Sequence, residues 1–188
     1  MALKSHVTAR RAILLLSVLA GALVTTRPAR AGTITVTTNL DAATGDGLCS
    51  LREAIIAANG DRIVDACPAG NGVDTIVLPA GAYPLTLAGR FEQLAATGDL
   101  DIYTDMTLIG AGQDDTFIDG RVLDRVFEVR AGAAVQIDGL TLENGDADAE
   151  DGGGLYVDAS TVTPPIATTP IPPSCSGYCL ALPELHRP

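Results

Sequence analysis

Short apolar runs separated by turn residues set the pattern of the chain from residue 74 to residue 158. Ile, Leu, Val and Thr form these runs, and Gly, Asp and Asn stand between them. The pattern is typical of β-strands bounded by turns. An alternating run at residues 32–38, well before this region, is also predicted to be a strand. The predicted strands are 32–38, 75–78, 85–87, 100–103, 106–109, 116–118, 126–129, 135–137, 140–142 and 155–157.

The runs fall into two series that recur at a loose period. TIVL, LDIY, VFEV and LYV begin at residues 75, 100, 126 and 155, and LTL, MTLI and VQI begin at residues 85, 106 and 135. A repeat of roughly 20–30 residues that holds two or three strands is typical of a β-solenoid. An antiparallel sandwich is the alternative, but only Asp119-Gly120 and Asp138-Gly139 resemble two-residue hairpin turns. We therefore favour the solenoid, which makes the fold class all-β.

One helix is predicted, over residues 50–59. Ser50 and Glu53 have the spacing of a capping box, in which the hydroxyl accepts from a free amide of the first turn and the carboxylate reaches back. The apolar positions that repeat at helical spacing are Leu51, Ala54, Ile55 and Ala58. Such a helix buries one face, and Asn59-Gly60 predicts a left-handed stop.

This helix is expected to cap the first turn of the solenoid. A bare first turn would expose apolar side chains and unpaired strand edges. Capping and surface pairing account for Glu53 and its neighbour Arg52, whereas acid–base catalysis by the two is the alternative. The structural role is favoured.

Residues 1–31 have the layout of a secretory signal peptide. A basic start with Lys4, Arg10 and Arg11 precedes an apolar run of 13 residues, 12–24, and small residues follow at positions 29 and 31. The run is shorter than the roughly 20 residues that span a bilayer, which disfavours a membrane anchor, the alternative. The Arg10-Arg11 pair fits a twin-arginine signal only loosely. Ordinary export to the cell surface or the medium is expected, with no stable membrane span after cleavage.

The exported chain would be strongly acidic. Cleavage after Ala31 removes five basic residues and leaves 7 basic against 23 acidic side chains, a net charge of −16. Phosphate contacts need Lys and Arg, so this charge argues against nucleic acid or anionic membranes as partners.

The four cysteines allow three disulfide pairings, and the sequence alone does not choose among them. They are Cys49, Cys67, Cys175 and Cys179. We favour the pair Cys49–Cys67, because both lie in the compact N-terminal segment and export makes a disulfide plausible. A zinc site is the rival, but His6 and His186 lie in the signal segment and the tail, too far along the chain to suggest one.

Residues 49–55, CSLREAI, are very similar to the motif that names the CSLREA domain, an N-terminal module of large exported bacterial proteins. The resemblance covers roughly residues 33–158. It implies a right-handed parallel β-helix of the pectin-lyase-like type, outside the cell or at its surface, and members of this family generally lack an assigned activity. Further segments that carry the resemblance are 57–59, 65–70, 74–81, 97–102, 108–112, 118–120 and 139–142.

The expected organisation is a signal peptide over 1–31, a cap over 32–73, β-helix turns over 74–158 and a disordered Pro-rich tail over 159–188. Seven of the eleven prolines lie between residues 161 and 188, and proline cannot donate to a strand ladder. A frame-shifted or truncated gene is the favoured explanation of the tail. A natural flexible tail, with Cys175 and Cys179 closing a small loop, is the alternative.

Carboxylates are the candidates for chemistry. Asp99 and Asp101, two apart in a strand, can share a face, bind calcium or raise the pKa of one partner. The alternative, which we favour, is that Asp99 closes a turn after Gly98. The other acidic candidates are Asp114, Asp115, Asp119, Asp146, Asp148, Glu150 and Asp151. Residues 146–151 are expected to form a solvated bend, with calcium as the minor alternative.

No catalytic set is evident in the sequence. The basic residues considered within the core of the coils are Arg121, Arg125 and Arg130, and arginine stays protonated, so a lyase base is missing. The expectation is a non-catalytic exported module, structural, adhesive or glycan-binding, whose partner is a glycan or another surface protein. No cofactor is expected, calcium being the exception considered. The alternative is a fragment of a lyase or hydrolase acting on acidic glycans.

Overall fold

The computed structural model describes residues 31–43, 45–148, 152–163 and 167–168. This part of the chain consists mainly of short strands in parallel sheets, with one helix, α1 (Leu51–Asn59). No helix among these residues is long and apolar enough to cross a membrane. The strands are β1 (Thr33–Thr35), β2 (Asp74–Leu78), β3 (Gly81–Pro84), β4 (Leu100–Ile102), β5 (Met106–Gly110), β6 (Thr116–Asp119), β7 (Phe127–Val129), β8 (Ala134–Asp138), β9 (Thr141–Glu143), β10 (Leu155–Val157), β11 (Thr161–Thr163) and β12 (Ala167–Thr168).

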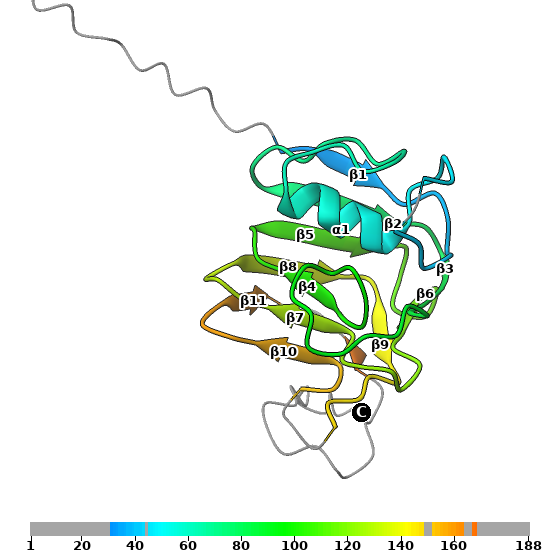
Figure 1. The fold of residues 1–188 in the computed structure, drawn as a ribbon, viewed down its shortest axis with the longest axis vertical. Coiled ribbons are helices and arrows are strands. Elements are labelled where there is room, and N and C mark those ends of the chain that lie inside the picture. The colour runs from blue at the N-terminus through cyan, green and yellow to red at the C-terminus, as the bar shows by residue number, and fades with distance from the viewer. Residues whose placement is uncertain (1–30, 44, 149–151, 164–166, 169–188) are drawn as a thin grey trace, which may run out of the picture.

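The strands form three sheets that the chain visits in a fixed order. The sheets have the orders β1-β2-β5-β8-β11, β3-β6-β9-β12 and β4-β7-β10, and every strand pairing is parallel. In Figure 1 the first sheet descends from β1 at the N-terminal end to β11. The antiparallel sandwich is therefore excluded, and Asp119-Gly120 and Asp138-Gly139 do not close hairpins.

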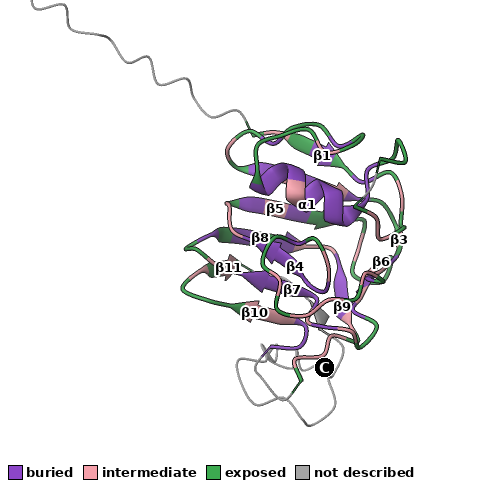
Figure 2. Cartoon of the chain, in the orientation of Figure 1, coloured by how far each residue is buried: buried purple, intermediate pink, exposed green. Residues whose placement is uncertain are grey.

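Aliphatic side chains stack in register beneath the first sheet. Ile34 pairs with Ile76, Ile76 with Leu108 and Leu108 with Ile137, and all four side chains are fully buried. Since alternate residues of a strand point to opposite faces, one column of apolar residues runs through four strands. Figure 2 shows this buried interior between the exposed turns.

The two predicted series of strands are partly wrong. LDIY, VFEV and LYV do share a sheet, as β4, β7 and β10, but TIVL (β2) belongs with MTLI (β5) and VQI (β8). The loop of residues 85–99 lies between β3 and β4 and lengthens the first turn. The sequence separation between β2 and β4 is therefore close to one repeat, although the two strands lie in different sheets. Equal spacing in sequence therefore did not mean equal position.

Residues 85–87 were predicted as a strand and do not form one. The strand of that sheet is β3, which ends at Pro84, and only the amide of Leu85 continues the ladder, to Asp119 O at 2.8 Å. The next two amides, of Thr86 and Leu87, donate instead to Asp41 Oδ2 at 2.6 and 2.9 Å. The Asp41 side chain thus accepts the hydrogen bonds that a neighbouring strand would otherwise accept.

The strands continue beyond residue 158, where the sequence analysis ended them. β11 pairs with β8, and β12 pairs with β9. The prolines at positions 164 and 165 fall between these two strands in the sequence, not within them. The predicted signal segment up to residue 30, and the tail beyond residue 168 with Cys175 and Cys179, lie outside the described residues.

The predicted capping box of α1 is confirmed. The Ser50 side chain accepts from the Glu53 amide at 3.1 Å, and Glu53 Oε2 accepts from the Ser50 amide at 3.0 Å. The C-terminal stop differs from the prediction, because Gly60 has φ −109° and the left-handed residue is Asp61, with φ 45°.

The helix is buried on nearly all sides and packs against β1, β2 and β4. The disulfide Cys49–Cys67, favoured from the sequence, joins the start of α1 to the segment that follows it, with Cα atoms 4.8 Å apart. At the other end, Asn59 Nδ2 donates to Asp101 O at 2.7 Å, and Asn59 Oδ1 accepts from the Tyr103 amide at 3.1 Å. Asn59 thereby satisfies backbone groups of β4, the edge strand of its sheet.

Candidate functional site

The outer face of the sheet β4-β7-β10 carries polar side chains in a column. The register pairs Leu100 with Phe127 and then with Leu155 on the inner face. One residue further, it pairs Asp101 with Glu128 and then with Tyr156. Because successive residues alternate between faces, the second set points away from the apolar interior.

Three carboxylates meet on this face. Asp99, Asp101 and Glu128 each place one carboxylate oxygen within 4.8 Å of the others. All three residues are nevertheless buried, with exposed fractions of 3 %, 0 % and 6 %. The structure therefore brings the predicted pair Asp99 and Asp101 together and adds Glu128.

The repeat of the strand sequences LDIY and VFEV could have identified Glu128 as the equivalent of Asp101, but the alignment of the two strands was wrong by one residue. Aligning LDIY with VFEV at their first letters sets Asp101 beside Phe127. The actual register shifts the second strand by one residue, since Leu100 pairs with Phe127. A shift of one residue exchanges the two faces of a strand, so Asp101 and Glu128 were not recognised as equivalent positions.

Two oxygens of the carboxylate cluster have no hydrogen-bond partner. Asp101 Oδ2 accepts from the Ala95 amide at 3.0 Å, but Asp101 Oδ1 and Asp99 Oδ2 are buried without one. Buried carboxylate oxygens are normally satisfied, because their desolvation is costly. These two oxygens therefore give the cluster acceptor capacity that no donor of the described residues uses.

Burial raises the pKa of both aspartates. The pKa of Asp99 rises from 3.8 to about 8, chiefly through desolvation, with further increases from the charges of Asp101, Asp124 and Glu128 and a decrease from Arg125. Desolvation raises the pKa of Asp101 to about 6, against the effect of its hydrogen bond from Ala95. At neutral pH the cluster therefore favours a proton or a cation over bare carboxylates.

A pocket of about 560 Å³ opens beside the cluster, lined by Asp99 and Glu128 among others. The loop of residues 90–93 forms one wall, and Ala147 and Asp148 form another. The remaining lining residues are Asp124, Arg125, Arg130 and Tyr156. A concave site with converging polar groups and perturbed pKa values is the best candidate for binding in the described part of the chain.

Aromatic and basic side chains occupy the pocket rim. Phe91 is 81 % exposed and has φ 66°, a backbone conformation that bulky residues rarely adopt. The Arg125 guanidinium lies 4.9 Å from the centroid of the Tyr156 ring. Arg130 pairs with Glu128 at 3.0 Å, and Arg90 pairs with Asp146 at 2.9 Å and Asp148 at 3.0 Å.

The other candidates from the sequence lie apart from the pocket or hold its wall. Asp146 and Asp148 anchor Arg90, so the predicted solvated bend is in part an ion-pair site, while Glu150 and Asp151 lie outside the described residues. Asp119 accepts from the Arg121 amide at 2.9 Å and so closes a turn. Asp114, Asp115 and Arg121 do not line the pocket.

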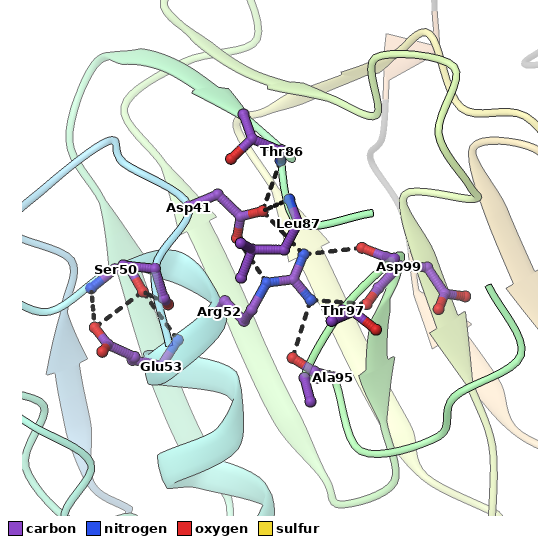
Figure 3. Close-up of polar contacts among 12 residues, drawn as sticks. Asp41, Ser50, Arg52, Glu53, Thr86, Leu87, Ala95, Thr97 and Asp99 are labelled. Carbon is purple, nitrogen blue, oxygen red and sulfur yellow. Dashed lines mark hydrogen bonds and ion pairs between the residues drawn. The ribbon is translucent and has the colours of Figure 1, made fainter. Parts of the chain in front are cut away.

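A buried arginine fixes the backbone beneath the cluster (Figure 3). Arg52 is fully buried and pairs with Asp41 through Nε at 2.6 Å and Nη2 at 3.2 Å. Its guanidinium also donates to three carbonyls of the 85–99 loop, those of Ala95 at 2.9 Å, Gly98 at 2.8 Å and Asp99 at 3.2 Å. The predicted surface pairing of Arg52 is therefore wrong: this side chain positions Asp99.

Gly98 is required where the loop turns into β4. It has φ 62°, and a side chain there would collide with the Gly89 carbonyl. Neither Arg52 nor Glu53 lines the pocket, which leaves the acid–base alternative for that pair without a substrate site. Comparisons of the chain with protein-family models, curated proteins and solved structures found no match.

Proposed function

We propose that the chain winds as a right-handed parallel β-helix whose first turn is capped by α1. Support comes from the fixed order of visits to three parallel sheets, in which each strand from β5 onward pairs with the strand three places earlier. Right-handed winding is the strong rule for parallel crossovers. The resemblance of residues 49–55 to the CSLREA motif points to the same architecture.

The proposed location is the cell surface or the medium. The signal-like segment 1–31 and the disulfide Cys49–Cys67 support it, because disulfides persist in oxidising compartments. Release of a chain that begins near residue 32, found by N-terminal sequencing of the secreted protein, is the expected result. A full-length chain retained in the cytoplasm would contradict it.

The proposed activity is non-catalytic binding of a glycan in the pocket beside β4, β7 and β10. The observation that carries it is the combination of exposed Phe91 and half-buried Tyr156 with carboxylates and guanidiniums in one concavity. Aromatic rings offer flat apolar surface to a sugar ring. The charged groups beside them can exchange hydrogen bonds with hydroxyls, as polar groups in pockets commonly do to fix a ligand's orientation.

Replacement of the rim aromatic tests this proposal. Phe91→Ala is expected to weaken binding to a glycan identified on an array by about tenfold, which corresponds to about 1.4 kcal/mol, as measured by calorimetry. Leu94→Ala is the matched control, since Leu94 is 66 % exposed in the same loop and does not line the pocket. Equal affinities of the wild type and both variants would rule out the pocket as the glycan site.

Cleavage of an acidic glycan is the second candidate, favoured by one observation. The raised pKa of Asp99, about 8, would keep this group protonated near neutrality, as a general acid requires. Release of reducing or unsaturated ends by the purified protein, abolished by Asp99→Asn and Asp101→Asn, would support the enzyme. Glycan binding without products supports the module.

A further inference from the structure

The carboxylate cluster carries more negative charge than its surroundings neutralise. Among the described residues, the guanidinium that lowers the pKa of Asp99 is that of Arg125 and the one that lowers the pKa of Asp101 is that of Arg130, which also pairs with Glu128. The carboxylates that surround or form the cluster are Asp99, Asp101, Asp124, Glu128 and Glu92. A divalent cation would offset this excess.

The unpartnered oxygens belong to two buried side chains. Asp99 is 3 % exposed and Asp101 is fully buried, and both retain an oxygen with no donor, Oδ2 and Oδ1 respectively. An ion bound between them would supply the missing interaction for both atoms at once. This observation is independent of the charge count, because it concerns hydrogen bonds that are absent and not the sum of charges.

The spacing of the oxygens suits calcium. Calcium–oxygen distances are about 2.3–2.6 Å, so two oxygens on opposite sides of one ion are up to about 4.6–5.2 Å apart. The three carboxylate oxygens lie within 4.8 Å of one another, inside this limit. Magnesium, with distances of about 2.0–2.1 Å, spans only about 4.2 Å. A spread of up to 4.8 Å is closer to what calcium spans than to what magnesium spans, so small side-chain movements would close the three oxygens around a calcium ion.

We propose that Asp99, Asp101 and Glu128 form a calcium site at the floor of the pocket. Hard oxygen ligands are those that calcium prefers, and its remaining coordination positions would be filled by water from the pocket that Asp99 and Glu128 line. Arg52 would hold the Asp99 backbone in place for this role. The site does not depend on glycan binding, which can be tested separately with a chelator present.

Thermal unfolding of the purified secreted protein tests the site. Calcium-binding extracellular modules have dissociation constants of about 0.1–1 mM. After chelator treatment, addition of about 10 mM calcium is therefore expected to raise the unfolding midpoint by about 4–8 °C. Magnesium at the same ionic strength is the comparison, because an acidic protein gains some stability from any divalent salt; a clearly smaller rise is expected with it.

The variant Asp101→Asn tests whether Asp101 is a calcium ligand or has only a structural role. Without calcium this variant should be as stable as the wild type or more stable, since it removes a buried negative charge, but its response to calcium should be lost. Calorimetry should show an affinity at least about tenfold weaker, as loss of even an indirect partner weakens metal binding 10- to 100-fold. Asp114→Asn, the same change at an exposed turn residue outside the pocket, should respond as the wild type does.

Three outcomes would overturn the site. They are no rise in the wild-type midpoint, an equal rise with magnesium, and an unchanged calcium response in Asp101→Asn. If Asp101→Asn does not fold, Glu128→Gln takes its place in the same comparison, and calorimetry of the wild type, in which a single calcium site is expected, decides without any variant. If the wild-type protein responds to calcium but binds no glycan, the proposed glycan-binding function is contradicted and the calcium site is not.

Discussion

Asp99 shows how one residue acquires unusual chemistry from its place in the chain. Gly98 provides the turn before it, Arg52 holds its carbonyl, and the register of β4 with β7 sets its side chain near Glu128. Of these residues, only Gly98 is next to Asp99 in the sequence. Its pKa of about 8 is thus a product of tertiary structure, chiefly of burial.

Stability of the calcium-free protein is expected to fall as the pH rises from 5 to 8. The pKa values of Asp99 and Asp101 are higher in the folded protein, about 8 and about 6, than the ordinary value of 3.8. The folded state therefore holds these protons more tightly, so their stabilising effect is complete below about pH 4 and is lost as the pH rises toward 8.

Urea unfolding in the presence of a chelator measures this dependence. A decrease on the order of a few kcal/mol is expected between pH 5 and pH 8, since one pKa unit corresponds to about 1.4 kcal/mol. Asp99→Asn should flatten the profile. Asp146 serves as a contrast, because its pKa is lowered by its hydrogen bonds with the Asp148 amide and Arg90, so it is ionised in both states over this range.

At the scale of elements, the helix was well predicted from sequence because its signals are local. The capping box of Ser50 and Glu53 lies within four residues, and the apolar positions follow one helical period. Arg52 was misjudged because its partners, Asp41 and the loop near Gly98, are distant in sequence. The cluster was half predicted for the same reason: Asp99 and Asp101 are close in sequence, whereas Glu128 depends on register.

Arg52→Met is expected to destabilise the protein by about 3–5 kcal/mol, because it leaves Asp41 buried without its counterion. Asp41 is 2 % exposed in its side chain. The double variant Arg52→Met with Asp41→Asn should recover part of the loss in a urea-unfolding cycle. Arg62→Met, at an exposed position just beyond the same helix, should change stability by no more than about 0.5 kcal/mol. Similar effects of the two arginine substitutions would contradict the role of Arg52.

At the scale of the whole molecule, stability depends on contacts between neighbouring turns of the chain. Each strand in the middle of a sheet pairs with one strand above and one below, and the apolar column through Ile76, Leu108 and Ile137 links them. A residue in the middle of this column therefore supports two interfaces, whereas a residue on an outer strand supports one.

Leu108→Ala is expected to lower the free energy of unfolding by about 2–5 kcal/mol, the usual range for a buried leucine. Val162→Ala lies on β11, the last strand of its sheet within the described residues, where Val162 pairs with Val135. This change should cost less than about 1.5 kcal/mol and should mainly speed local hydrogen exchange in β11. Amide exchange measured with urea unfolding distinguishes the two. Equal global losses would show that the strands do not act as a stack of interfaces.

The direction of pairing also sets an order of assembly during synthesis. From β5 onward, each strand adds to one that precedes it in the sequence. The N-terminal segment is closed on itself by α1 and the bond between Cys49 and Cys67. Once β1 to β4 are in place, a chain that emerges N-terminus first therefore presents an existing sheet edge to each later strand, so that no strand from β5 onward has to wait for its first partner.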